Sequence, residues 1–276
     1  MRVAVTGAAG LIGGVVFDRL VGEGHDVIGI DRPHSDWMDA GRNTDDASAP
    51  SRVTHHFDLA EATDSEWQMM LADCEVAVHL AADANPSNSD ESMLRNNILV
   101  TTNFMRNAKE SGVRRVVLSS SGLTQVGLEA ELLLGGSLEG QLIGVKHRTS
   151  TTSTYGETKV FVERLGQYYS SGLGMECIVV RIGTVIPSES EHWERGGRLQ
   201  ATAFLQADVA NFFSAAVEAD FSSWDSQSCE GHPNIPGYLL TAAQSDSPAR
   251  FVDLEPGISA LGWSPIEWPS GPEHLQ

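Results

Sequence analysis

The 276-residue sequence lacks the features that mark several large classes of protein. Its three cysteines are too few and too scattered for a disulfide framework or a metal cluster, so we expect free thiols in a reducing cytoplasm and no metal site. It has no apolar run long enough to span a bilayer. The first residues lead directly into a short apolar segment and a glycine loop, so we expect no signal peptide.

Positive charge is also scarce. Eighteen lysines and arginines face 37 aspartates and glutamates, for a formal net charge of −19, and only Lys109, Lys146 and Lys159 are lysines. So acidic a surface repels nucleic acids and anionic membranes, which argues against both as partners. We hypothesise a halophilic source, because high salt screens such self-repulsion. Full stability at low ionic strength would contradict this hypothesis.

What the sequence does contain is a regular alternation of short apolar runs and segments with helical period. Such alternation is typical of a parallel sheet covered on both faces. The predicted strands span residues 3–6, 27–30, 53–57, 76–80, 116–119 and 177–181, and the clearest helices span 11–23, 96–111 and 155–170. We predict an α/β fold, a Rossmann-type doubly wound parallel sheet.

A glycine-rich turn comes after the first predicted strand. Gly7, Gly10 and Gly13 have the spacing G-x-x-G-x-x-G between a strand and a helix. The first glycine permits a tight turn, the second lets the backbone approach a pyrophosphate, and the third allows close helix–strand packing. An ordinary turn can also carry three glycines, so the interpretation depends on the residues that end the later strands. The other predicted cofactor contacts in this turn are Ala9, Leu11 and Ile12.

The ends of the next strands fit a dinucleotide site. Asp31 ends the second strand, where its carboxylate can accept hydrogen bonds from the adenosine ribose and repel a 2′-phosphate, so we predict NAD as the cofactor. Arg32 is the next residue and would instead hold that phosphate, which leaves NADP open. Further predicted cofactor contacts lie after the third and fourth strands: Asp58, Leu59, Leu80, Ala81 and Ala82.

A tyrosine and a lysine four residues apart open the predicted helix 155–170. This spacing places Tyr155 and Lys159 on one helical face, where both would lie beside the cofactor. A phenol with a pKa of about 10 is a poor base, but a nearby ammonium favours the phenolate, which can then exchange a proton with a hydroxyl as hydride moves. Such a pair also occurs by chance on solvated helix surfaces.

The position of the pair favours catalysis. It comes after a strand that ends in three serines at the carboxyl edge of the predicted sheet. Ser121 is the expected hydroxyl that polarises the reacting oxygen, although strand-end serines also satisfy backbone groups. Asn97, on the preceding helix, is the expected fourth catalytic residue, with packing inside the helix as the alternative.

Together these residues resemble the extended short-chain dehydrogenase/reductases of the NAD-dependent epimerase/dehydratase family. The resemblance implies the family's cofactor and catalytic roles for the matching positions, adds Ile182 to the cofactor contacts, and implies a homodimer through the helices 96–111 and 155–170. The matching motifs lie in the family's order at residues 6–13, 31, 58–59, 79–82, 96–97, 119–121, 155–159, 181–183, 208–210 and 261–265.

Residues 180–184 resemble the uronate dehydrogenase branch and its haloarchaeal relatives, which oxidise the anomeric carbon of a free sugar to a lactone. The stretch after Gly183 is shorter than nucleotide-sugar enzymes usually carry, which favours a small substrate. The resemblance implies a substrate arginine at Arg195, with a solvated loop arginine as the alternative. The expected substrate contacts are Ser121, Gly122, Thr184 and Arg195.

Departures from the branch pattern make uronate itself less favoured. Gly122-Leu123 stands where the uronate enzymes have an Asn-His pair, and Ala84 or a neighbour replaces a serine. A basic cluster at residues 146–148 would either bind an anion such as a sugar phosphate or only balance the acidic surface. We therefore expect NAD-dependent oxidation of a small aldose, uronate or sugar phosphate, with a nucleotide-sugar epimerase or dehydratase as the alternative.

The strand–helix alternation fades after about residue 184 into pieces punctuated by proline and glycine. We expect residues 1–183 to form the dinucleotide-binding domain with the catalytic helix. Residues 184–276 would form a small substrate-binding lobe that partly returns to the core and covers the carboxyl edge of the sheet. The segment 33–50 is predicted to be an exposed loop.

Overall fold

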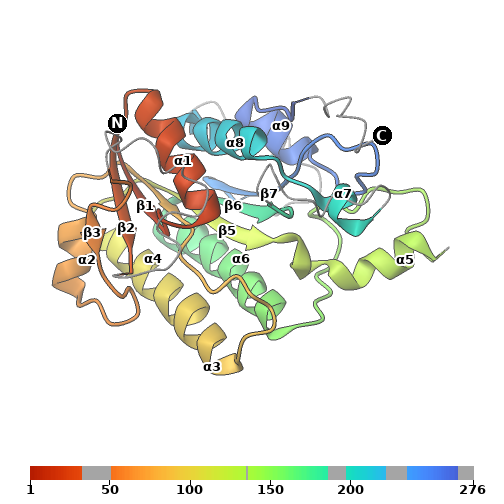
Figure 1. Ribbon diagram of the computed structural model, residues 1–276, viewed down its shortest axis with the longest axis horizontal. Helices are drawn as coiled ribbons and strands as arrows, with labels where there is room; N and C mark the ends of the chain where they lie inside the picture. Colours follow the sequence, from red (N-terminus) through yellow and green to blue (C-terminus); the bar gives the residue numbers. More distant parts are fainter. Residues whose placement is uncertain (33–50, 135, 186–196, 222–234, 267–276) are drawn as a thin grey trace.

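The apolar runs build one seven-stranded parallel sheet in the order β3-β2-β1-β4-β5-β6-β7 (Figure 1). The computed structural model describes residues 1–32, 51–134, 136–185, 197–221 and 235–266. Every residue of β5 and β7 is buried, as expected of strands covered on both faces. The strands are β1 Arg2–Thr6, β2 Asp26–Asp31, β3 His55–His56, β4 Val76–His79, β5 Arg115–Ser121, β6 Glu176–Ile182 and β7 Tyr238–Ala243.

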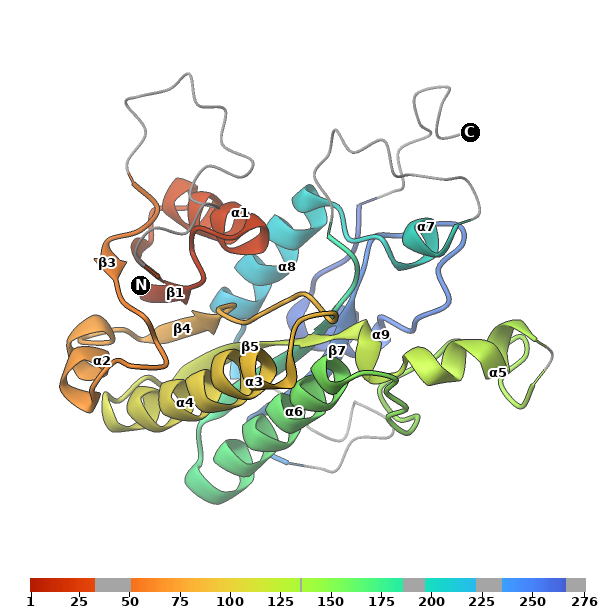
Figure 2. The ribbon, with the colours of Figure 1, turned by 60° about the horizontal axis from the view of Figure 1, so that its bottom comes forward.

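Helices cover both faces of the sheet, which confirms the predicted α/β architecture (Figures 1 and 2). On one face Phe17 and Phe212 belong to a core that joins the sheet to α1, α8 and α9. On the other face Trp67, Phe104 and Val162 join it to α2, α4 and α6. The helices are α1 Leu11–Gly22, α2 Asp64–Met70, α3 Asp90–Met93, α4 Val100–Glu110, α5 Glu129–Leu133, α6 Thr154–Leu173, α7 Arg198–Thr202, α8 Gln206–Glu218 and α9 Glu255–Leu261.

The largest difference from the sequence analysis is β7, which pairs with β6 from Cys177↔Tyr238 to Ile182↔Ala243. Its short run ends in two alanines, which have low strand propensity, so local pattern did not reveal it. Helix α8 packs against α1, and α9 against β7. The described part of 184–266 thus contributes a strand and two helices to the central core. Its role as a substrate lobe stays a prediction.

Two element boundaries also differ. The predicted third strand, 53–57, pairs only at His55–His56. The predicted helix 96–111 continues from α3 through a π-helical turn at Leu94–Leu99 into α4. Asn97 lies inside this wider turn, and single π-helical turns of this kind are often found at functional sites.

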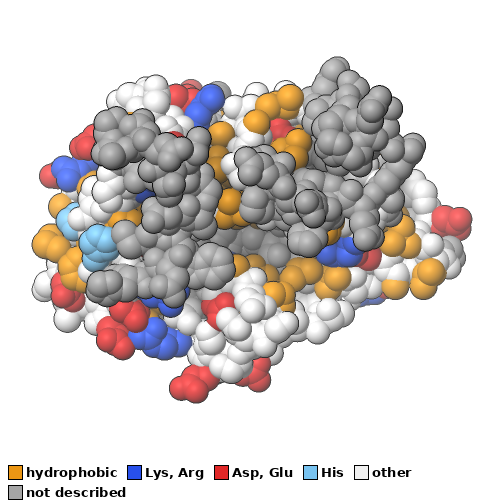
Figure 3. Space-filling model, in the orientation of Figure 1, with side chains coloured by type: hydrophobic (Ala, Val, Ile, Leu, Met, Phe, Trp, Pro, Cys, Tyr) orange, Lys and Arg blue, Asp and Glu red, His pale blue; other side chains and the backbone are white. Residues whose placement is uncertain are grey.

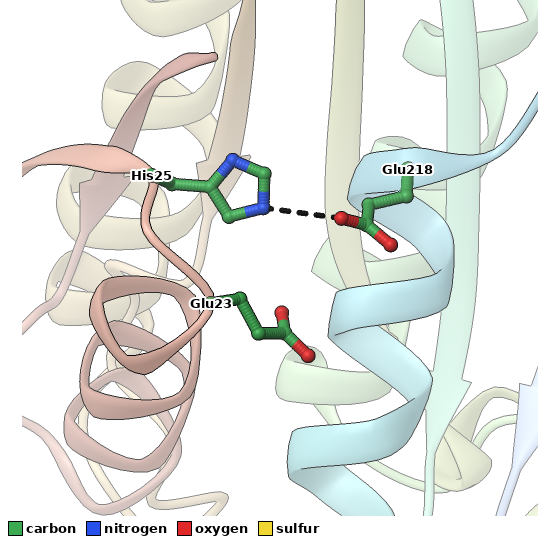
Figure 4. A group of neighbouring side chains, drawn as sticks. All are labelled: Glu23, His25 and Glu218. Carbon is green, nitrogen blue, oxygen red and sulfur yellow. Dashed lines mark ion pairs between the residues drawn. The ribbon is translucent and has the colours of Figure 1, made fainter.

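Ion pairs are spread over the acidic surface, where Figure 3 shows lysine and arginine side chains beside carboxylates. At the amino-terminal edge of the sheet, His25 pairs with Glu218 of α8 at 3.4 Å, next to Glu23 (Figure 4). These three side chains are near enough for a metal ion. The Glu23 carboxylate, however, already accepts hydrogen bonds from Arg19 at 2.6 Å and Ser214 at 2.9 Å. We interpret the group as an ion-pair network that ties α1 to α8.

No helix in the described ranges is both long enough and apolar enough to cross a membrane.

Candidate active site

The glycine turn after β1 brings two backbone segments together with no side chain between them. A Cβ at Gly13 would lie 1.9 Å from the carbonyl oxygen of Gly7, and a Cβ at Gly7 would lie 2.8 Å from the backbone nitrogen of Ala81. Gly7 also has a φ of +72°, in the left-handed region that favours glycine. The turn is therefore a bare backbone cradle at the start of α1, the geometry that phosphate groups require.

A cavity of about 540 Å³ opens at the carboxyl edge of the sheet. It includes the switch point where β1 lies between β2 and β4, the place where open α/β sheets bind ligands. The structure brings together at this cavity most of the predicted site residues: Gly7, Gly10, Leu11, Ile12, Gly13, Leu80, Ala82, Ser121, Gly122, Tyr155, Lys159, Ile182 and Thr184.

Other predicted cofactor residues lie around the cavity rather than on its wall. The Asp31 carboxylate accepts hydrogen bonds from the backbone nitrogens of Ala9 at 2.9 Å and Arg32 at 2.8 Å, so it faces the glycine turn. Asp58 forms two hydrogen bonds with Arg95, at 3.3 and 2.9 Å. Burial raises the pKa of Asp58, but hydrogen bonds from Arg95 and a backbone N–H outweigh it and hold that pKa below its ordinary value.

Leu59 and Ala81, which also lie off the cavity wall, have structural contacts. Leu59 is buried in the core beneath α2 and α4. The backbone nitrogens of Leu80 and Ala81 donate to the hydroxyl of Thr6, at 3.2 and 3.3 Å. Thr6 thus holds the loop after β4 against the glycine turn.

His79 extends this support. Its ring nitrogens contact the hydroxyls of Thr6 at 2.8 Å and Thr101 at 3.1 Å, and the ring stacks on Phe104 at 4.3 Å. Burial, with a smaller effect of the Lys159 charge, lowers the pKa of His79 to about 3. The imidazole is therefore neutral near pH 7 and acts as a fixed bridge between β1, β4 and α4.

Three of the four predicted catalytic groups come from two elements that meet at the cavity. Ser121 ends β5, whereas Tyr155 and Lys159 lie in the first turns of α6. The ammonium of Lys159 donates to the carbonyl oxygen of Ser119 at 3.0 Å and lies 5.6 Å from the Tyr155 ring centroid. All three side chains are buried and line the cavity, so their polar atoms have little contact with bulk water and are held in place for a ligand. This arrangement can exchange a proton with the hydroxyl of a ligand that lies beside Tyr155 and Ser121.

The pKa of Tyr155 differs from the sequence-based expectation. Burial raises it above the ordinary value, a hydrogen bond with Ser121 opposes this, and the negative charge of Asp83 adds to it. Lys159 is not among the causes of this shift, so the expected lowering of the Tyr155 pKa by its ammonium is not seen. The phenolate therefore needs further positive charge in the cavity to form at neutral pH.

Burial lowers the pKa of Lys159 to about 8. Because the unfolded chain keeps this lysine protonated to a higher pH, the free energy of unfolding contributed by this group rises as pH rises above about 8.

We expect Lys159→Met to be more stable than the wild type at pH 7, by up to about 3 kcal/mol, because methionine fills similar space without the buried charge. Turnover should fall at least 10²-fold, since the ammonium beside Tyr155 is lost. At pH 10 the gain should shrink to below about 1 kcal/mol, because the wild-type lysine is then largely neutral in the folded state. Urea unfolding at both pH values measures this, and equal stability at pH 7 would contradict it.

A buried charge pair lies behind the serines. The guanidinium of Arg181 on β6 donates two hydrogen bonds of 2.8 Å to the carboxylate of Glu163 on α6. Ser120 donates to the same carboxylate at 2.7 Å, and the Tyr238 hydroxyl donates to the backbone oxygen of Glu163 at 3.1 Å. This network joins β5, β6 and β7 to α6, so we expect it to help fix Ser121, next to Ser120, relative to Tyr155.

Asn97 is buried next to the catalytic helix. Its side chain bonds both backbone groups of Asp83, at 2.7 and 3.1 Å, and the hydroxyl of Thr158 at 3.1 Å. Among the residues that the structure describes, these contacts tie the loop after β4 to α6 and do not reach Tyr155 or Lys159. A catalytic role for Asn97 stays a prediction.

The chain matches one known protein family over most of its length. Residues 3–215 match the NAD dependent epimerase/dehydratase family. The chain belongs to this family. The resemblance predicted from the motifs is therefore confirmed, and so is NAD as the cofactor.

Two relatives and one solved structure show the extent of the similarity. The chain is 30% identical over 273 residues to the L-arabinose 1-dehydrogenase (NAD(P)(+)) of Haloferax volcanii, covering 96% of both chains. It is 25% identical over 270 residues to the NAD-dependent glucose-6-phosphate dehydrogenase of that organism, covering 95% of this chain and 92% of the relative. The glucuronic acid dehydrogenase of Chromohalobacter salexigens shares the fold, with a TM-score of 0.72 and 22% identity over 98% of this chain and 85% of the other.

The family's cofactor fits the cradle that this chain builds. At Gly7 and Gly13 the place of a Cβ is taken by backbone, which allows the tight turn and its close packing. Gly10 lines the cavity without a side chain, so phosphates can approach the N–H groups at the start of α1 there. Asp31 lies at the end of β2, beside that cradle. These residues would hold the pyrophosphate and the adenosine ribose.

Asp31→Ala should shift cofactor preference toward NADP. Removal of the carboxylate ends its repulsion of a 2′-phosphate, so we expect the ratio of kcat/KM for NAD to that for NADP to fall about 10-fold or more. The ratio is the measured quantity, because loss of the hydrogen bond from Ala9 weakens both cofactors alike. Arg32→Ala is the control and should move the ratio the other way. An unchanged ratio in Asp31→Ala would reject this role.

The far wall of the cavity comes from the C-terminal part of the chain. Thr184 pairs with the segment around α7, its hydroxyl 2.8 Å from that of Thr202. The predicted substrate residue Arg195 lies outside the described residues. Arg198, three positions later at the start of α7, lines the cavity, as do Glu129 and Gln244. Sequence reasoning missed these three, although Arg198 lies only three positions after the predicted substrate arginine.

Proposed function

We propose that this protein oxidises the anomeric carbon of a small sugar to a lactone, with NAD as hydride acceptor. The main support is that Ser121, Tyr155 and Lys159 line the same cavity of about 540 Å³ as the glycine turn. The similarity to L-arabinose 1-dehydrogenase over 96% of both chains supports a free sugar as substrate.

Each side chain has a defined task in this proposal. The phenolic oxygen of Tyr155 takes the proton of the anomeric hydroxyl, and Ser121 donates a hydrogen bond to the same oxygen as its bond to carbon becomes double. Lys159 holds positive charge beside the phenol. NAD, held by the glycine turn and Asp31, would supply the hydride acceptor and a positive charge that would lower the pKa of the buried tyrosine.

Net reduction of NAD tests the proposal. Purified protein with NAD and a panel of aldoses, uronates and sugar phosphates should form NADH in proportion to the sugar consumed. Conversion of a nucleotide sugar to its epimer without net NADH would support the epimerase alternative. Absence of NADH with every sugar would contradict the proposal.

The homodimer implied by the family resemblance also stays a prediction. Helices α4 and α6 lie side by side in the structure (Figure 2). Leu99, before α4, and Tyr168, on α6, expose apolar surface that a second copy could cover. Light scattering of the purified protein measures the mass.

A further inference from the structure

The carboxylate partners of the cavity's arginines point to the charge of the substrate. Arg198 begins α7 and lines the cavity, with 44% of its side chain exposed. Its Nε and Nη2 atoms donate to the two carboxylate oxygens of Glu129, each at 2.7 Å. This two-bond arrangement is the one that an arginine uses to bind a carboxylate or phosphate. Glu129 therefore occupies the Nε–Nη2 edge of Arg198 and balances its charge, so an anionic sugar that approached the Nη1 side would lie near the Glu129 carboxylate.

The surroundings of Glu129 restrict its side chain. It is the first residue of α5, its side chain is only 12% exposed, and it lines the cavity itself. An incoming anion would have to displace a partner from the same chain or place a second negative charge beside it.

Arg181, the other arginine on the described part of the cavity wall, is also paired with a carboxylate. Arg181 donates two hydrogen bonds to Glu163, and both side chains are buried. Its Nη1 atom has no hydrogen-bond partner within the described residues. A neutral hydroxyl could accept from Nη1, whereas an anion there would lie close to the Glu163 carboxylate.

The basic cluster at 146–148 adds no unpaired positive charge to the described cavity wall. Arg148 pairs with Glu131, on the same helix as Glu129, and the three cluster residues are not among those that line the cavity. Of the cationic side chains on the described cavity wall, only Lys159 has no carboxylate partner, and it lies beside Tyr155.

We infer that the cavity selects an uncharged aldose, and that Glu129 excludes uronates and sugar phosphates by pairing with Arg198. Sugar hydroxyls both donate and accept, so they can bond Glu129 and Arg198 without breaking the pair. This inference deepens the proposed function and rests on it.

D-galactose and D-galacturonate form a matched probe, because they differ only in the group at carbon 6. We expect the wild type to have a kcat/KM for galactose at least about 100-fold above that for galacturonate, measured as NADH formation at fixed ionic strength. The kcat/KM for glucose should exceed that for glucose 6-phosphate by a similar factor.

Glu129→Gln should raise kcat/KM for galacturonate about 10-fold or more, through a lower KM, because the amide keeps the shape but frees the charge of Arg198. The measured quantity is the ratio of kcat/KM for galacturonate to that for galactose, which should rise about 10-fold or more even if a lost hydroxyl contact with Glu129 weakens both sugars. Glu131→Gln is the matched control: it frees Arg148 outside the cavity and should leave both substrates unchanged. Adding Arg198→Gln to Glu129→Gln should abolish the gain for galacturonate.

Two results would overturn the inference. One is a wild type that oxidises galacturonate as well as galactose, and the other is a Glu129→Gln variant with no gain for the uronate. Calorimetric binding of both sugars to the protein with NADH tests charge selection separately from turnover. Absence of NADH with every sugar defeats the proposed function, whereas equal binding of the two sugars defeats only the charge selection.

Discussion

Replacement of Tyr155 by phenylalanine should lower kcat by about 10³-fold, within the 10²–10⁴-fold range of a lost acid–base group. The ring of Tyr155 is buried, and phenylalanine preserves its packing beside Lys159. Only the hydroxyl is removed, the group that bonds Ser121 and that we propose as the acceptor of the substrate proton. Affinity for the cofactor should change little, because the glycine cradle and Asp31 belong to β1, α1 and β2. Steady-state kinetics and NADH fluorescence titration measure the two effects.

Tyr168→Phe is the control for this variant. Tyr168 lies on the same helix, its side chain is 57% exposed, and it does not line the cavity. Loss of its hydroxyl should leave kcat within about 2-fold, since surface changes rarely disturb a distant site. If Tyr155→Phe turned over sugar as fast as Tyr168→Phe, the assignment of Tyr155 as the proton acceptor would be wrong.

The parts of the site that could be predicted from the sequence depend on short-range geometry. The glycine spacing acts within one turn, where each missing side chain has a local reason: Gly13 faces the carbonyl of Gly7 six residues earlier. Tyr155 and Lys159 share a face because of the helical period alone. Ser121 could be placed because parallel strands end at a common edge. Such short-range constraints can be read directly from the spacing of residues in the sequence.

The missed parts depend on contacts between distant segments. Glu129 and Arg198 are 69 residues apart, and nothing in the sequence around either residue indicates the other. A pattern can show that Asn97 is polar, but not that it bonds Asp83 rather than Lys159. The raised pKa of Tyr155 likewise reflects how completely the fold removes it from water, which spacing does not encode. The charge of the preferred substrate depends on such tertiary pairs, so it could be inferred only from the structure.

Arg181→Met should destabilise the protein by about 3–5 kcal/mol, the usual effect of removing one partner from a buried ion pair. Methionine fills part of the space, but the Glu163 carboxylate would stay buried with only Ser120 as a side-chain donor. Urea unfolding measures the change in the free energy of unfolding. Arg106→Met is the control, because Arg106 pairs with Asp64 at the surface and its loss should cost less than about 1 kcal/mol.

Adding Glu163→Leu to Arg181→Met tests the cause of that loss. If the buried carboxylate without its partner is responsible, removing it should restore most of the stability, since a buried ion pair is often replaceable by apolar residues. Turnover should not recover, because Ser120 then has no carboxylate to anchor β5 to α6 beside Tyr155. Recovery of full turnover in the double variant would show that the pair stabilises the fold without positioning Ser121. Arg181→Met no less stable than Arg106→Met would contradict the buried pair itself.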